Sequence, residues 1–154
     1  MKLTSTKDDQ LDDDYIDIKY RQLTPVIHKI FQLCNTTASV LLCEKQGVVC
    51  NVDVNDILYI EWVDNVSCIY TKDDVFSMDS PLVYLEDTLK HQHFIRVSKM
   101  ALVNLYKIKS VSNGLHFRLT AEMINGENVV INRHYRKGLL AAIRELAKEI
   151  SENV

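Results

Sequence analysis

The stretch FIRVSKMALVNL, residues 94–105, sets the fold that we expect for this chain. Its first four residues are mostly large and apolar and predict a short strand. Ser98 and Lys99 interrupt the apolar pattern, and residues 100–104 are few enough to form either a strand or an irregular segment. Asn104 ends that apolar run, and a buried polar side chain must be hydrogen-bonded. We therefore expect a strand, an exposed turn, and an asparagine that holds a loop backbone.

A second stretch, VVINRHYRK at residues 129–137, places basic side chains between a strand and a helix. The strand breaks at Asn132, and the apolar spacing over residues 135–150 predicts a terminal amphipathic helix. Arginine can donate two hydrogen bonds to guanine, and lysine or serine can reach phosphates or base edges. A solvated basic edge would give the same pattern, so both interpretations stay open at this point. The basic side chains concerned are Arg133, His134, Arg136 and Lys137.

The remaining chain has the pattern of many short strands and few helices. Helices are expected over residues 25–35 and from Pro81 to the His91-Gln-His93 segment, and Asn113-Gly114 and Asn125-Gly126 are hairpin signals. Strands and helices do not alternate, which excludes a parallel doubly wound sheet. We predict a mainly β fold with flanking helices, of the α+β class. The further strands are expected over residues 15–20, 39–44, 48–52, 57–63, 67–71, 75–79, 108–112, 115–122 and 129–132.

Charge is unevenly distributed along the chain, although the net charge is only −3. Residues 51–90 contain two basic and nine acidic residues, whereas residues 91–154 contain ten basic and five acidic residues. The C-terminal part is therefore the candidate face for an anionic partner. The acidic part would repel DNA and help to orient the domain on it.

Composition indicates an ordinary cytoplasmic protein. No segment approaches the roughly 20 apolar residues that cross a membrane, and residues 1–14 lack the apolar region of a secretory signal. The four cysteines form no CxxC pair and each lies in an apolar stretch, which favours reduced buried thiols. Disulfides or a zinc site are the alternatives. The cysteines are Cys34, Cys43, Cys50 and Cys68.

Motifs of common enzymes are missing from the sequence. It contains no Gly-rich phosphate loop, no GxSxG and no HExxH. His91 and His93 could begin a metal site, but no further ligand follows at a suitable spacing, and histidine is also favoured at a helix C-terminus. Asp73-Asp74 resembles a phospho-acceptor pocket only superficially, because a receiver domain needs a doubly wound sheet. We expect no enzyme, no cofactor, no metal and no small-molecule substrate.

Several segments, taken in order, resemble the LytTR DNA-binding family. The resemblance covers roughly residues 48–145, and although no single motif is unique, the ordered set is specific. It is closest to stand-alone bacterial members that lack a receiver domain. The segments are DILYIE at 56–61, LEDTL at 85–89, FIRVSK at 94–99, LVN at 102–104 with Ile108, NGE at 125–127 and INRHY at 131–135.

The resemblance implies an elongated, mostly antiparallel β arrangement whose loops enter successive major grooves of double-stranded DNA. Family base-contacting positions carry over to Asn65 through Ser67, to Ser98 and Lys99, and to Arg133. Arg133 is the foremost candidate and Lys99 the second. Neighbouring His134, Arg136 and Lys137 complete the implied DNA-binding set.

Some positions depart from the family pattern, so the preferred DNA sequence does not carry over. Met100 and Asn132 stand where the family often has serine, and Trp62 stands where it usually has a small residue. Arg96 belongs to the family signature and is either a DNA contact or a structural residue.

The N-terminal part lies outside the resemblance. We expect a flexible acidic tail over residues 1–14 and a strand-helix-strand unit over residues 15–47, followed by the DNA-binding domain over residues 48–154. The alternative function is a protein-interaction module that acts through this unit. Its partner would be a second copy, giving a homodimer, or a small membrane-bound inhibitor of the kind thought to regulate some stand-alone members.

Overall fold

The structure is a computed structural model and describes residues 18–22, 24–27, 30, 40–114, 116 and 118–152. The expected acidic tail and Cys34 lie outside the described residues. Of the helix expected at 25–35, residues 25–27 and 30 are described and helical. A strand was expected over residues 15–20. Its described part, residues 18–20, is not a strand and pairs with none of the described strands.

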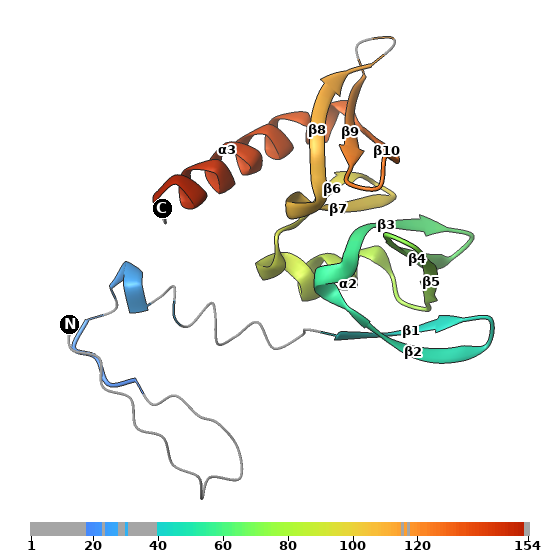
Figure 1. Cartoon of the computed structure of the whole chain (residues 1–154), viewed down its shortest axis with the longest axis horizontal. Coiled ribbons are helices and arrows are strands. Elements are labelled where there is room, and N and C mark those ends of the chain that lie inside the picture. The colour runs from blue at the N-terminus through green and yellow to red at the C-terminus, as the bar shows by residue number, and fades with distance from the viewer. Residues whose placement is uncertain are drawn as a thin grey trace, which may run out of the picture.

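A seven-stranded antiparallel sheet forms the larger part of the fold, in the order β2-β1-β5-β4-β3-β7-β6 (Figure 1). Residues 101–104, which the sequence left open, form one of its strands. The boundary expected after residue 47 falls in the turn of a hairpin, since the first two strands pair along their whole length. The strands are β1 (Val40–Lys45), β2 (Val48–Asp53), β3 (Ile57–Val63), β4 (Val66–Thr71), β5 (Val75–Met78), β6 (Phe94–Ser98) and β7 (Ala101–Asn104).

A smaller three-stranded sheet contains β8 (Ile108–Asn113), β9 (Leu119–Met123) and β10 (Asn128–Ile131). The strand expected from residue 115 begins only at Leu119. The N–H of Gly114 donates to the carbonyl oxygen of Arg118 at 2.6 Å, so a loop separates β8 from β9 instead of the tight Asn113-Gly114 turn that we expected. Gly126, with φ at +86°, does occupy the turn before β10.

Helices α2 and α3 and four short 3₁₀ segments accompany the two sheets. Helix α2 (Leu82–Leu89) packs on one face of the larger sheet through Leu82, Leu85 and Leu89. Helix α3 (Arg136–Glu152) buries Leu139 and Leu146, whereas Ile150 at its far end is 53% exposed, so the apolar face expected along the whole helix is covered only in part. The 3₁₀ segments are η1 (Val54–Asp56), η2 (Lys90–Gln92), η3 (Leu105–Lys107) and η5 (Arg133–Tyr135).

Strands β3 and β7 are buried on both faces and supply both hydrophobic cores. Ile57, Ile60 and Leu102 pack with α2 in the first core. Leu58 and Val103 pack in the second core, together with residues from the smaller sheet and α3. Burial on both faces explains why these strands have continuous apolar sequences rather than an alternating pattern.

A hydrogen bond near the second core joins the two sheets. The phenol of Tyr59 donates to Oε2 of Glu127 at 2.8 Å, and the Tyr59 ring stacks on Tyr70 with the centroids 4.3 Å apart. Burial, followed by the hydrogen bond to the Glu127 carboxylate, raises the pKa of Tyr59 above its usual value, which favours the protonated phenol that donates this hydrogen bond. This contact fixes the turn after β9 against β3.

Asn104 is buried and holds the loop backbone, as the sequence predicted. Its Nδ2 donates to the carbonyl oxygen of Ile57 at 2.9 Å, and its Oδ1 accepts from the N–H of Tyr106 at 3.1 Å. One side chain therefore fixes both the start of β3 and the segment that leads into the smaller sheet.

Replacing Asn104 with alanine is expected to lower the free energy of unfolding by about 1–3 kcal/mol, because two backbone groups lose their partner in a buried site. Urea denaturation measures this change. Asn128→Ala, at an exposed position on β10, is the control and should change stability by no more than about 0.5 kcal/mol. Equal effects of the two substitutions would contradict this role for Asn104.

Candidate nucleic-acid interface

Backbone hydrogen bonds bring together three segments that are far apart in the sequence. Asp64 and Asn65, with φ at +50° and +63°, form the exposed turn between β3 and β4. Nearby, the N–H of Trp62 donates to the carbonyl oxygen of Met100 at 2.8 Å, which attaches the turn between β6 and β7 to the end of β3. The N–H of Asn132 donates to the carbonyl oxygen of Val97 at 2.9 Å. The segment before α3 therefore lies beside the same turn.

The Arg96 side chain supports the turn that contains Lys99. Its Nε donates to Oε2 of Glu86 in α2 at 2.7 Å, and its guanidinium also donates to the carbonyl oxygen of Lys99 at 2.9 Å. The Arg96 side chain is only 18% exposed. These contacts support the structural interpretation of Arg96, in which it connects helix α2 to the turn and supports Lys99.

Two of the expected serines have local structural contacts. The Ser98 hydroxyl accepts from the N–H of Met100 at 3.1 Å and so shapes the turn, while its side chain remains partly exposed. Ser67 is fully buried, and its hydroxyl donates to the carbonyl oxygen of Ser80 at 2.7 Å. Ser67, predicted as a DNA contact, is therefore not accessible to a partner, whereas Asn65 lies at the exposed tip of the turn.

The foremost basic candidates are solvent-exposed. Lys99 lies at the tip of its turn, Arg133 and His134 lie in η5, and Lys137 lies in the first turn of α3. Within the described residues, no side-chain hydrogen bond or ion pair engages these four side chains. Their hydrogen-bond donors are therefore available to an anionic or polar partner.

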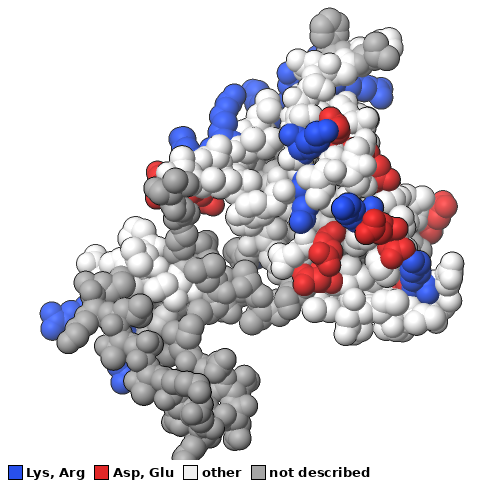
Figure 2. All heavy atoms as spheres, viewed as in Figure 1, with Lys and Arg blue, Asp and Glu red and all other residues white. Residues whose placement is uncertain are grey.

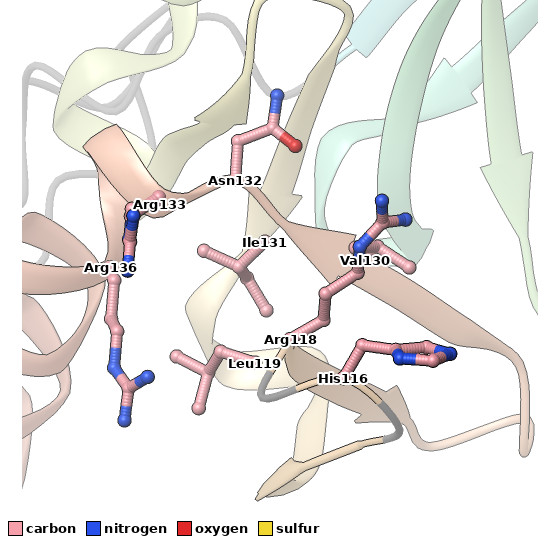
Figure 3. Close-up of a pocket in the computed structure, with 8 residues that line it drawn as sticks. All are labelled: His116, Arg118, Leu119, Val130, Ile131, Asn132, Arg133 and Arg136. Carbon is pink, nitrogen blue, oxygen red and sulfur yellow. The ribbon is translucent and has the colours of Figure 1, made fainter.

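A basic hollow, which the sequence did not predict, adjoins these residues. Figure 3 shows Arg136 on one side of Leu119 and Ile131, and Arg118 and His116 on the other side. The Arg136 guanidinium donates to Oδ1 of Asn113 at 3.2 Å, which ties the start of α3 to β8. Arg118 and His116 come from the loop between β8 and β9, so only the pairing of β9 with β8 and β10 brings them to the same hollow as Arg133. One indirect signal was present in the sequence, the basic excess of residues 91–154.

Charge on the surface follows the division that the sequence predicted. Figure 2 shows Lys and Arg side chains spread over β8–β10 and α3, and a band of acidic side chains over the larger sheet. Asp74, just before β5 in the larger sheet, forms an ion pair with Lys45. An acid also lies among the basic side chains of the smaller sheet: Oε1 of Glu122 in β9 is 3.1 Å from the Lys109 ammonium, which lowers the pKa of that carboxyl.

His91 and His93 are the two histidines that could begin a metal site. The His93 ring packs edge-on against Tyr106, with the centroids 4.5 Å apart, and His91 is exposed. In the described part of the chain, no three His, Cys, Asp or Glu side chains gather in an arrangement that could hold a metal ion. Nor is any helix among these residues long and apolar enough to span a membrane.

The fold and the surface together define a class: a small antiparallel β domain that presents exposed basic loops from a rigid scaffold. The family model described as LytTr DNA-binding domain matches residues 47–144, and the chain belongs to this family. The fold and family predicted from the ordered motifs are therefore confirmed.

Known proteins that are similar to this chain include a sensory transduction protein and a solved DNA-binding domain. The sensory transduction protein LytR of Staphylococcus saprophyticus is 24% identical over 101 residues, which cover 66% of this chain and 40% of that protein. The chain thus spans about two fifths of the length of this relative. A solved LytTr DNA-binding domain of a methyl-accepting/DNA response regulator from Bacillus cereus superposes with a TM-score of 0.64 at 22% identity, covering 68% of this chain and 96% of that chain.

Proposed function

We propose that this protein is a bacterial transcription regulator that binds specific DNA sequences through the three neighbouring segments described above. The observation that carries the proposal is their attachment to one another. The turn at Asn65, the turn at Lys99 and the segment at Arg133 are exposed and basic or polar, and backbone hydrogen bonds from Trp62 and Asn132 hold them in place. Loops held by a rigid sheet are common sites of recognition.

The proposed contacts divide into base reading and phosphate binding. Arg133 would donate two hydrogen bonds to guanine in a major groove, and Lys99 with Ser98 would contact the neighbouring groove or its backbone. His134, Arg136 and Lys137, extended by His116 and Arg118 across the basic hollow, would bind the phosphates between them. The acidic band over the larger sheet would keep DNA away from that side. Such a regulator acts on the chromosome and therefore in the cytoplasm.

Arg133→Ala is expected to cost about 1–3 kcal/mol of binding free energy and to relax the preference at one base pair, because a bidentate contact with guanine is lost. Gel-shift titration against the preferred site and its single-base variants measures both effects. Arg144→Ala is the matched control, since Arg144 is also an exposed arginine but lies about 12 Å further along α3 than Arg136. Unchanged affinity and unchanged base preference in Arg133→Ala would remove Arg133 from the proposed contacts.

Lys99→Ala is expected to weaken binding and, if the ammonium neutralises one phosphate, to reduce the salt dependence. The slope of log K against log salt should become shallower by about 0.9. Fluorescence anisotropy at several salt concentrations measures the slope, and Lys148→Ala near the end of α3 is the control. Wild-type affinity together with a wild-type slope would argue against a role for Lys99.

A second candidate function, interaction with a protein partner, is favoured by the exposed apolar side chains of the first hairpin. Leu42 is 64% exposed and Val49 is 69% exposed. We infer that this hairpin, together with the N-terminal part of the chain, supports a homodimer on DNA. A small membrane-bound inhibitor that uses the same surface is the alternative occupant.

The homodimer is expected to be visible by light scattering of the full chain bound to its DNA site, as a complex that contains two protein chains. Replacing both Leu42 and Val49 with aspartate should reduce the complex to one chain per DNA site. A single chain per site in the wild-type complex would exclude the homodimer.

A further inference from the structure

Two cysteines face each other directly in the hairpin formed by β1 and β2. Cys43 pairs with Cys50 in the register of these antiparallel strands, and both carry free thiols. Side chains of directly opposed residues lie on the same face of a sheet, about 4.5–5.5 Å apart at Cβ. We propose that Cys43 and Cys50 form a reversible disulfide across the strands and make the hairpin a site of thiol oxidation.

The turn of the hairpin determines the kind of pair to which the cysteines belong. Gln46 and Gly47, with φ at +52° and +78°, form a two-residue turn that is closed by the pair Lys45 and Val48. The closing pair of such a turn exchanges both backbone hydrogen bonds, and every second pair beyond it does the same. The pair Cys43 and Cys50 is therefore a hydrogen-bonded pair, with a Cα separation of about 5.5 Å.

This geometry permits a disulfide but does not favour it strongly. A Cα separation of about 5.5 Å lies within the normal range for disulfides, whereas the Cβ atoms must approach to about 3.8 Å. The two strands therefore have to shift toward each other, and the strain makes the bond easy to reduce. The chain segment between the cysteines is short, so the bond removes little entropy from the unfolded chain. These properties suit a reversible modification better than a permanent crosslink.

The two thiols differ in solvent exposure, and this difference determines which of them reacts first. Cys50 is partly exposed on the edge strand β2, and its Sγ lies 3.5 Å from the carbonyl oxygen of Val48. Cys43 is only 2% exposed, and burial, followed by the neighbouring Cys50, raises its pKa to about 11. An oxidant therefore reaches Cys50 first, and Cys43 attacks afterwards.

The oxidant that we propose is a low-molecular-weight disulfide such as oxidised glutathione. The Cys50 thiolate attacks one glutathione sulfur, breaks the glutathione disulfide and releases one glutathione thiolate. The Cys43 sulfur then attacks the Cys50 sulfur, while the Cys43 thiol proton passes to the departing sulfur of the second glutathione. Two protein thiols become one disulfide, one glutathione disulfide becomes two thiols, and the two protons of the cysteines pass to the two glutathiones.

The proposal does not depend on DNA binding, because the hairpin contains none of the proposed DNA contacts. The test incubates the full folded chain with oxidised glutathione and then uses mass spectrometry of intact protein and of peptides. In a variant with Cys34 and Cys68 both changed to serine, we expect a mass loss of two hydrogens, a peptide crosslinked between residues 43 and 50, and full reversal by dithiothreitol.

Cys50→Ser in the same background should form no crosslink. The second variant is Cys43→Ala, in which alanine is chosen because Cys43 is buried. It should retain a stable mixed disulfide of glutathione at Cys50, because no thiol at position 43 can displace the glutathione. A mixed disulfide that persists at Cys50 while Cys43 is intact would overturn the proposal. Failure to form any Cys43–Cys50 crosslink would overturn it as well.

Discussion

The burial of β3 and β7 on both faces is the constraint on which the rest of this structure depends. One face of the pair contributes Ile60 and Leu102 to the core under α2, and the other contributes Leu58 and Val103 to the core under the smaller sheet and α3. Each core therefore needs the other to keep these strands in place. A one-residue slip in register would exchange the two sets of side chains and disrupt both cores.

The same constraint places the candidate DNA-binding surface. Since the positions of β3 and β7 are fixed, the turns at their ends are fixed as well, and Trp62 connects one turn to the other. Arg96 adds a connection from Glu86 in α2 to the carbonyl oxygen of Lys99. Asn132 then attaches the segment before α3 to the end of β6. Buried contacts and backbone hydrogen bonds therefore hold the backbone that presents the exposed side chains.

Sequence reasoning predicted the parts of the structure that depend on local patterns. The strand β3, the hydrogen-bonded Asn104 and the amphipathic helix α3 all followed from the identity and spacing of residues. The short apolar run of residues 100–104 did not by itself distinguish a strand from an irregular segment, and it forms β7. Sequence reasoning could not predict that Ser67 is buried, because an alternating strand does not reveal which face is covered. Nor could it place Arg118 in the same hollow as Arg133, since this arrangement depends on strand pairing across a loop rather than on a tight Asn113-Gly114 turn. The exposed end of α3 could not be predicted either. An apolar face shows which side of a helix is buried, but it does not show how far along the helix the packing partner extends.

The central claim is that the turns at Asn65 and Lys99 and the segment at Arg133 form one surface that reads DNA. The most direct measurement is selection of bound fragments from genomic DNA by the full chain, followed by sequencing and footprinting of the enriched sites. The account predicts a short shared motif, with protection in successive major grooves and on the backbone between them. Recovery of fragments without any shared motif, in proportion to their abundance in the starting pool, would contradict it.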